Sequence, residues 1–188
     1  KFLKGSLTVS LLLTDVFDTE KWEVTSRNNI FNLSNISNNK SRMLAGYCYN
    51  WVTQHHPTEM DIRLEDGFEA QWNFKDTSTW AIDANSFEQV GCIHTSQGLE
   101  FDYVGVIIGK DLIYRNQEVI TDPRARATTD QALRGLGNNL ALKDEIIRNT
   151  YKTLLTRGQK GCYIYCEDKA LAAYIREQIQ LMRSQQTV

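Results

Sequence analysis

Short hydrophobic runs of strand length recur along the chain, separated by polar or helical segments. Residues 103–108 (YVGVII) form a continuous run rich in β-branched side chains, which is typical of a strand buried on both faces in the middle of a parallel, helix-covered sheet. The shorter runs 43–51 (MLAGYCYNW), 87–93 (FEQVGCI) and 161–166 (GCYIYC) predict further strands. The pattern therefore predicts a mostly parallel sheet.

Two segments in the second half of the chain have the spacing of amphipathic helices. In residues 140–156 apolar side chains recur three, four and seven apart, and Gly158 is placed to end this helix in the left-handed conformation. Asp168 is placed to cap a final helix with an apolar face of Leu171, Ile175, Ile179 and Met182. Strands that alternate with helices and loops indicate an α/β sandwich.

The polar segments between these elements predict loops. Residues 54–66 and 111–139 are of this kind, and Trp72, Trp80 and Ile82 flank a polar turn that suggests a short hairpin or an edge element. The second loop carries Arg115, Arg124, Arg126 and Arg134, which could follow a phosphate backbone. The aspartates interleaved with them, Asp122 and Asp130, favour a solvated loop instead.

Composition narrows the class of protein. The 188 residues are 41% hydrophobic and 23% charged with a net charge of -2, which predicts a folded domain and argues against a polybasic binder. No apolar run reaches the roughly 18 residues that a membrane span needs. Because the chain begins with Lys1, we expect a fragment of a longer protein, with one domain over 1–188 in which 1–40 is a peripheral or linker segment.

The cysteines point to a compartment rather than to a metal. Each of them, Cys48, Cys92, Cys162 and Cys166, falls within a predicted strand, and none has zinc-type spacing. We therefore expect no metal site. Buried free thiols are typical of a reducing environment, so we expect a cytoplasmic protein.

One segment only superficially resembles a phosphate-binding loop. Residues 105–111 read GVIIGKD, but a P-loop needs four residues between its glycines and a Ser or Thr after its Lys. Asp111 would also repel a phosphate. We interpret this segment as a strand end, and the chain contains no other candidate for a triphosphate cradle.

Residues 94–102 (HTSQGLEFD) follow a predicted strand and carry candidate chemistry. The hydroxyls and the amide suit hydrogen bonds to a sugar-phosphate backbone, and Gly98 would let the backbone approach a ligand closely. Glu100 could accept a hydrogen bond from a ribose hydroxyl. The alternative is a strand-to-helix turn that is capped by Ser or Thr.

Residues 148–161 (RNTYKTLLTRGQKG) carry a second candidate, Arg157, at the end of a predicted helix. An arginine there interacts favourably with the helix dipole, which is a structural role. The same position also suits an arginine finger that stabilises charge on a transferring phosphoryl group.

Together these segments resemble a known family. HTSQGLEFD looks like motif V of superfamily 1 helicases, and LLTRGQKGCYIYC looks like their motif VI about 60 residues later. Further similarity over residues 16–18, 41–51, 72–73 and 90–111 resembles the Schlafen-like DNA/RNA helicase domain proteins. The resemblance covers roughly residues 15–175.

The resemblance implies a fold and a function. The fold would be a RecA-like three-layer sandwich with a mostly parallel sheet, a P-loop NTPase fold without its own P-loop. The chain would be the C-terminal motor domain of an ATP-dependent helicase or translocase. The alternative is a non-catalytic RecA-like module that binds nucleic acid or a partner protein. A doubly wound nucleotide-binding or receiver domain fits poorly, because the chain lacks a G-x-G-x-x-G after a strand.

The resemblance also implies residue roles. Single-stranded DNA or RNA would meet motif V at His94, Thr95 and Ser96. The nucleotide would meet Gln97, which stands where Lys is commoner, Gly98 at its γ-phosphate and Glu100 at its ribose. Arg157 would be the arginine finger.

The resemblance implies an ATP site that is shared between two domains, because this chain lacks part of it. The P-loop and the acidic residues that bind Mg²⁺ are absent, so ATP with Mg²⁺ would be bound mainly by an N-terminal RecA-like domain of the same protein. Phosphoryl transfer needs positioning by both halves, so we expect no ATPase activity from this chain alone. The match to motif IV around Arg42 is incomplete, because that motif's arginine normally follows its strand. Trp51, Trp72 and Trp80 are more often core residues than base-stacking ones.

Overall fold

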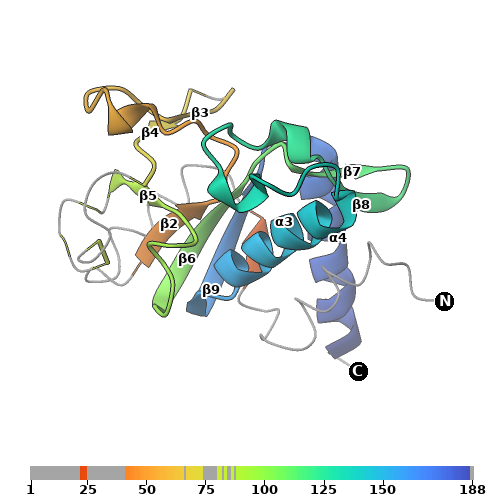
Figure 1. Cartoon of the computed structure of the whole chain (residues 1–188). Coiled ribbons are helices and arrows are strands. Elements are labelled where there is room, and N and C mark those ends of the chain that lie inside the picture. Colours follow the sequence, from red (N-terminus) through yellow and green to blue (C-terminus); the bar gives the residue numbers. More distant parts are fainter. Residues whose placement is uncertain are drawn as a thin grey trace.

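The computed structural model describes residues 22–24, 41–65, 67–73, 80–81, 83, 86 and 88–186 (Figure 1). Its centre is a five-stranded sheet in the order β1-β9-β6-β2-β5, with every pairing parallel. The strands are β1 (Trp22–Val24), β2 (Ser41–Ala45), β5 (Val90–Gly91), β6 (Phe101–Ile108) and β9 (Gly158–Cys166). The predicted parallel sheet is confirmed, and the β-branched run is its central strand.

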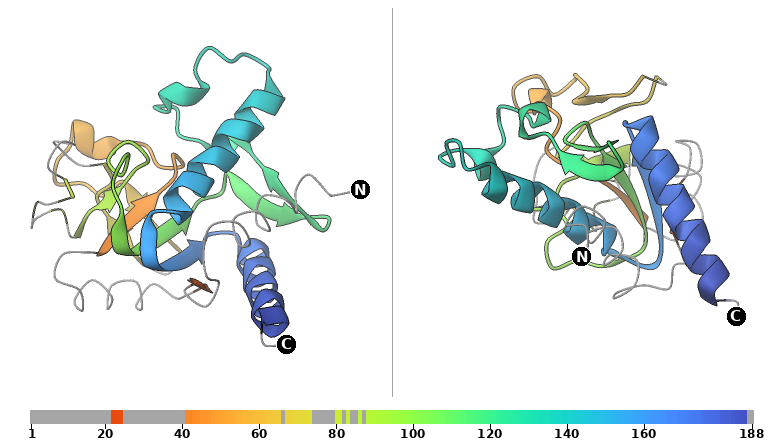
Figure 2. Two further views of the ribbon diagram at one scale, coloured as in Figure 1. Left: turned by 90° about the horizontal axis from the view of Figure 1, so that it is seen from below. Right: turned by 90° about the vertical axis from the view of Figure 1, so that its right-hand side faces the viewer.

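Two helices flank the sheet. Helix α3 (Leu140–Leu155) and helix α4 (Lys169–Gln186) lie on opposite faces, as the right-hand view of Figure 2 shows. The N-cap role of Asp168 is confirmed, because its Oδ1 accepts the Leu171 N–H at 2.8 Å. Leu171, Ile175 and Ile179 are buried on one face of α4. The result is the predicted three-layer α/β sandwich, compatible with a RecA-like domain. None of the described helices has the length and apolarity to span a bilayer.

The predicted loops contain small hairpins. Strand β3 (Ile62–Arg63) pairs with β4 (Glu69–Ala70), and β7 (Leu112–Arg115) pairs with β8 (Glu118–Thr121), both antiparallel. The β7–β8 turn places Asn116 and Gln117 at φ of 52° and 63°, the left-handed pair that hairpin turns favour. The short 3₁₀ helices are η2 (Val52–Gln54), η4 (Pro123–Ala125) and η5 (Gln131–Leu133).

Several predicted strand limits were wrong. Strand β2 begins at Ser41, before the predicted run 43–51, and includes the charged Arg42, which is buried. The Arg42 guanidinium donates to the carbonyls of Ser41 and Ala81 and lies over the Trp80 ring. Strand β2 ends at Ala45 and β5 covers two residues, so Cys48 and Cys92 lie outside strands. The buried guanidinium of Arg42 faces the protein interior.

The expectation for Gly158 was also wrong. Helix α3 ends at Leu155 with Thr156 as its C-cap, and Gly158 is already the first residue of β9. A Cβ atom at Gly158 would overlap the carbonyl oxygen of Gly161 and lie 2.9 Å from Val104 Cγ1. This glycine therefore permits close packing of the chain rather than a left-handed turn.

Two hydrophobic clusters form the core. The larger joins β6 and β9 to the helices, and the smaller connects β2 to the β3–β4 hairpin. Trp72 and Trp80 are 1% and 2% exposed, which makes both of them core residues. The hairpin suggested between them has its turn, 74–79, and Ile82 outside the described residues. Trp72 forms a parallel bridge with Val90 of β5, the strand at the edge of the sheet.

Candidate functional site

The two motif segments meet at the amino ends of β6 and β9. These strands are neighbours in register, with Phe101 opposite Gly158. The Phe101 N–H donates to the Arg157 carbonyl oxygen at 2.8 Å. Segments that lie far apart in the sequence thus form one corner of the sheet, which we call the motif corner: residues 97–102 and 156–160.

Arg157 is half-buried in this corner, on the turn that follows α3. Its Nε donates to the Thr153 carbonyl at 3.1 Å and its Nη1 to the Leu99 carbonyl at 3.3 Å. The first bond satisfies a carbonyl at the helix end, where a positive charge also complements the dipole. Nη2 donates to none of the described residues.

A β-bulge brings further side chains of the two motifs together. Two steps along β6, from Phe101 to Tyr103, are opposed by three along β9, from Gly158 to Gly161. Bulges re-aim side chains and are common beside active sites. Here Gln159 and Lys160 both reach the acidic residues of the neighbouring segment.

Both contacts are direct. Gln159 Nε2 donates to Glu100 Oε2 at 2.5 Å, and Lys160 Nζ donates to Asp102 Oδ2 at 2.8 Å. The bond from Lys160 to the Asp102 carboxylate raises the pKa of Lys160. Glu100 is exposed, so its carboxylate is oriented by Gln159 while remaining accessible to a ligand.

Gly98 is an exposed residue of the motif corner. Its φ is +73°, and a Cβ there would meet nothing within 4 Å. The position therefore uses glycine for its left-handed backbone and leaves open space beside it. Gln97, its neighbour, is also exposed. Leu99, on the other side, supplies the carbonyl that holds Arg157.

The other predicted site residues lie at the opposite end of the sheet. Leu44 is paired with both Gly91 and Val106, so β5 ends level with the second half of β6. His94, three residues beyond β5, is therefore at the carboxyl edge, whereas Arg157 is at the amino edge. The structure does not bring these two side chains together.

Thr95 and Ser96 use their hydroxyls inside the turn after β5. Thr95 Oγ1 accepts the Cys92 N–H at 2.7 Å and donates to the Cys92 carbonyl at 2.9 Å. Ser96 Oγ donates to the same carbonyl at 3.0 Å. Both residues are buried, while His94 is exposed. These hydroxyls stabilise the turn that presents the imidazole, and this turn leads to strand β6 rather than to the helix that the capping alternative expected.

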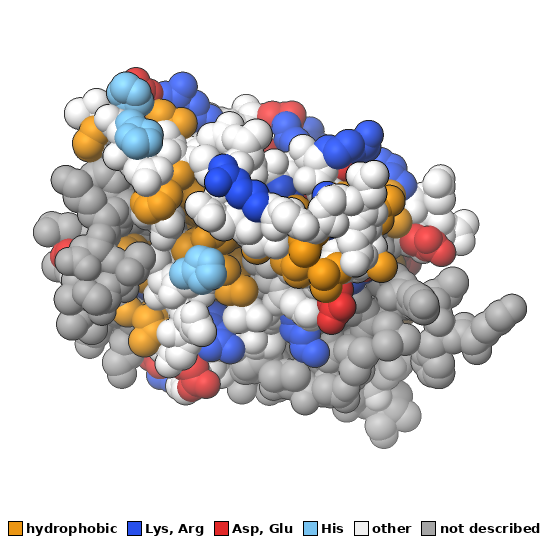
Figure 3. Space-filling view, viewed as in Figure 1, with side chains coloured by type: hydrophobic (Ala, Val, Ile, Leu, Met, Phe, Trp, Pro, Cys, Tyr) orange, Lys and Arg blue, Asp and Glu red, His pale blue; other side chains and the backbone are white. Residues whose placement is uncertain are grey.

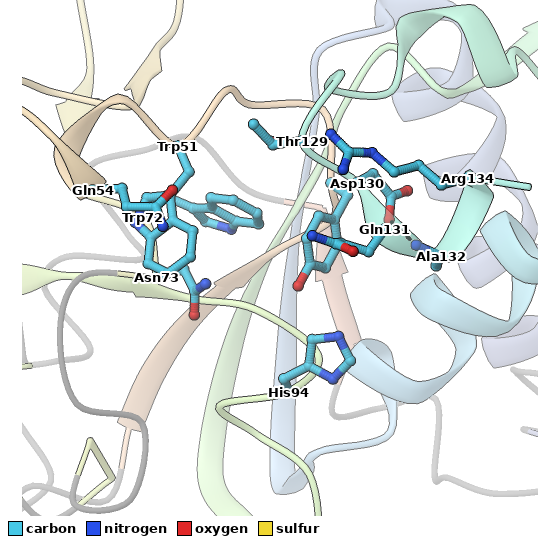
Figure 4. A pocket seen from close by; sticks show the side chains of 11 residues that line it. Trp51, Gln54, Trp72, Asn73, His94, Thr129, Asp130, Gln131, Ala132 and Arg134 are labelled. Atoms are coloured by element: carbon cyan, nitrogen blue, oxygen red, sulfur yellow. Dashed lines mark hydrogen bonds between the residues drawn. The ribbon is translucent and has the colours of Figure 1, made fainter.

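His94 lines a cleft with a volume of about 420 Å³. Tyr47, Trp51 and Trp72 line it together with residues 129–132 and Arg134 of the segment around η5 (Figure 4). Hydrophobic, histidine and basic side chains gather on this face of the molecule (Figure 3). The sequence did not indicate the cleft, because its walls come from four separate segments.

A buried charge cluster anchors the wall around η5. Arg126 Nη1 lies 3.1 Å from Asp111 Oδ2, and its Nε lies 2.8 Å from Asp130 Oδ2; all three side chains are at most 2% exposed. Burial alone would lower the pKa of Arg126, but the two carboxylates outweigh it and raise the pKa. The solvated-loop interpretation was thus wrong for this arginine. It holds for Arg124, which is exposed beside Asp122.

The same cluster touches helix α3. Tyr151 OH donates to Asp111 Oδ1 at 2.5 Å and accepts the Gly109 N–H at 3.0 Å. The Arg126 guanidinium also lies over the Tyr47 ring, 5.5 Å from its centroid. Burial, and next to it the neighbouring Cys92, raises the pKa of Tyr47, so this ring stays neutral at physiological pH. Among the described residues, no cluster of His, Cys, Asp or Glu could hold a metal ion.

Comparison with known proteins gives this geometry a context. The family model for "Schlafen group 3, DNA/RNA helicase domain" matches residues 22–168. The uncharacterized protein YPL245W of Saccharomyces cerevisiae is 28% identical over 138 residues, which is 67% of this chain and 30% of that protein. The chain thus spans about a third of that relative's length. No solved structure matches the chain. The family match covers most of the chain, including both motif segments, and the chain therefore belongs to the Schlafen group 3 DNA/RNA helicase domain family.

Proposed function

We propose that the chain is the C-terminal motor domain of an ATP-dependent superfamily 1 DNA or RNA helicase or translocase. The observation that carries the proposal is the position of Arg157, on the turn after α3 and against the motif V backbone at Leu99. An arginine finger needs this combination of a fixed backbone and an available guanidinium edge.

The motif corner has the chemistry to meet MgATP that is held mainly by another domain. Arg157 supplies positive charge for the phosphates, with Lys160 close by, and the open left-handed backbone at Gly98 admits a phosphate oxygen. Glu100, with Gln97 nearby, would accept from the ribose hydroxyls. ATP supplies the phosphoryl group that is transferred to water, and Arg157 stabilises the charge that develops on it.

Single-stranded nucleic acid would bind at the other edge of the sheet, at His94. In this proposal Thr95 and Ser96 act through the turn that presents the imidazole. The Mg²⁺-binding acids and the P-loop would come from an N-terminal RecA-like domain of the same protein, and this chain would hydrolyse no ATP by itself. We also propose a cytoplasmic location, which the four free cysteines support.

One observation favours the alternative of a non-catalytic nucleic-acid- or protein-binding module. Two donor groups of Arg157, Nε and Nη1, are already engaged by carbonyls within the domain. A purely structural arginine would be held in the same way. The two functions differ in whether loss of this guanidinium changes catalysis.

The test is ATP hydrolysis by the full-length protein with and without single-stranded DNA or RNA, for wild type, Arg157→Ala and Arg157→Lys. We expect nucleic-acid-stimulated turnover to fall by about 10³-fold or more in both variants, because Lys cannot reproduce the planar fork of Arg. Arg176→Ala, an exposed position on α4, is the matched control and should retain activity.

Equal melting temperatures of the variants and the wild type would show that a loss of turnover reflects catalysis rather than folding. Absence of hydrolysis, or hydrolysis that is indifferent to Arg157, would remove the motor function and leave the binding module.

A further inference from the structure

The cleft at the carboxyl edge of β2 and β5 is built from flat aromatic side chains. Tyr47 and Trp72 meet edge to face with ring centroids 4.8 Å apart, and His94 lies 5.9 Å from Tyr47 at an interplanar angle of 73°. Trp51 is half-buried beside them. Trp72 itself is buried and supports the Tyr47 ring, whereas Trp51 and the exposed His94 offer stacking surfaces, which is how unstacked nucleic-acid bases are held.

Hydrogen-bonding groups surround these rings. The amides of Gln54, Asn73 and Gln131 line the cleft and can each donate and accept, as the edge of a base requires. The buried indole N–H group of Trp51 finds no acceptor among the described residues. The indoles of Trp72 and Trp80 are in the same condition, but both lie in the core. Bases present ring nitrogens and carbonyl oxygens, the acceptors that the Trp51 N–H lacks.

Charge around the cleft is sparse. Arg134 is the one lysine or arginine among the described lining residues, and its Nη2 also donates to the Thr128 carbonyl at 3.3 Å. The carboxylate of Asp130 is taken up by Arg126 and the Ala132 N–H. A site that follows phosphates would gather several basic side chains. This lining suits a base, with Arg134 at the rim for an adjoining phosphate.

We infer that this cleft binds an unstacked base of a single-stranded nucleic acid. The choice of a strand as ligand rests on the proposed function. The base contact goes beyond that function, because it assigns recognition to Trp51, His94 and Arg134 rather than to the backbone-facing hydroxyls of motif V. The same base chemistry occurs in free nucleotides, so the test has to separate the two sources.

The test uses this chain and fluorescein-labelled oligodeoxythymidine and oligouridine of about 12 nucleotides, within the usual range of single-strand site sizes. The same oligomers with abasic sites in place of the bases are the second probe. We expect the abasic strands to bind about 5- to 100-fold more weakly, with quenching of tryptophan fluorescence by the base-containing strands alone.

The cleft variants are Trp51→Ala, His94→Ala and Arg134→Ala. Trp51→Ala and His94→Ala should reduce the difference between base-containing and abasic strands, a readout that general loss of stability does not move. If Trp51→Ala fails to fold, His94→Ala and Arg134→Ala still test the inference, because both of these side chains are exposed. Arg124→Ala removes an equal charge outside the cleft, and its side chain is 91% exposed, so it should bind as wild type.

Equal binding of abasic strands, absence of strand binding, or an Arg124→Ala defect as large as that of Arg134→Ala would overturn the inference. If thymidine or uridine monophosphate quenched the tryptophan fluorescence with the same dissociation constant as the oligomers, the ligand would be a free nucleotide rather than a strand. Failure of the proposed motor function is a separate result. It would appear as ATP turnover that is absent or indifferent to Arg157, and it would leave the difference in binding between base-containing and abasic strands unchanged.

Discussion

At the scale of single residues, the motif corner depends on Gly158, which permits close packing because glycine has no side chain. Gly158 lets the start of β9 pack closely against Gly161 and Val104, at the bulge from which Gln159 and Lys160 reach Glu100 and Asp102. A helix-ending glycine and a packing glycine have the same sequence signature, Gly after an amphipathic helix, so the sequence alone predicted the wrong role.

Gly158→Ala should therefore destabilise the chain strongly, by about 3 kcal/mol or more, because a methyl group would overlap backbone atoms that cannot move aside. Urea denaturation measures the free energy of unfolding. Gly67→Ala is the matched control: its φ is +80° but the space around it is open, so only backbone strain of about 1 kcal/mol is expected. Equal losses at both positions would contradict the packing argument.

At the scale of elements, α4 begins at a carboxylate with several partners. Asp168 accepts from the Leu171 N–H and the Tyr114 N–H and pairs with Arg115 at 2.7 Å, which joins the helix to β7. Burial alone would raise the pKa of Asp168, but the bonds from Arg115 and from the two N–H groups outweigh it and hold the pKa below its usual range.

Asp168→Ala should lower stability by about 1–2 kcal/mol near neutral pH through loss of the cap. The lowered pKa means that the ionic part of this contribution is fully present above the unfolded pKa of about 4 and is lost as the pH falls through the folded value. Thermal unfolding from neutral to acidic pH measures it. Asp168→Asn should keep most of the cap but lose this pH dependence; an unchanged pH profile would contradict the assignment.

The elements also show what a single sequence can predict. The strand predicted over 103–108, both long helices and the Asp168 cap follow from periodicity and end signals, which are local. The β7–β8 hairpin was missed because Asn116-Gln117 is a weaker turn signal than Asn-Gly. The position of Arg42 inside β2 depends on the Ala81 carbonyl and the Trp80 ring, which are distant in sequence. The two motif segments could be picked out from the sequence, and the roles of their residues stay predictions. The cleft could not be predicted, since its walls meet only in the folded chain.

At the scale of the whole molecule, the Asp111–Arg126–Asp130 cluster joins the layers. It connects the end of β6, the long connection before α3 and, through Tyr151, the helix that leads to Arg157. The cluster is a buried ionic network, and such networks lose most stability when one partner is removed and the others stay charged.

Arg126→Ala should therefore destabilise the chain by about 3–5 kcal/mol, measured by urea denaturation. Adding Asp111→Asn and Asp130→Asn to this variant should restore part of the loss, because no unpaired buried charge would remain. Hydrogen exchange should rise in residues 129–134, the cleft wall that Asp130 anchors. A loss below about 1 kcal/mol, typical of exposed pairs, would contradict the role of the cluster.

The strand order has a consequence for how the chain emerges from the ribosome. Strand β1 lies beside β9, with Trp22 opposite Cys162, so the first described segment is paired with the last described strand. The nascent chain has made β1, β2 and β6 long before β9 exists, and β9 lies between β1 and β6 in the sheet. Because such non-local pairing is slow, we expect the growing polypeptide to expose the edges of β1 and β6 until β9 has been translated.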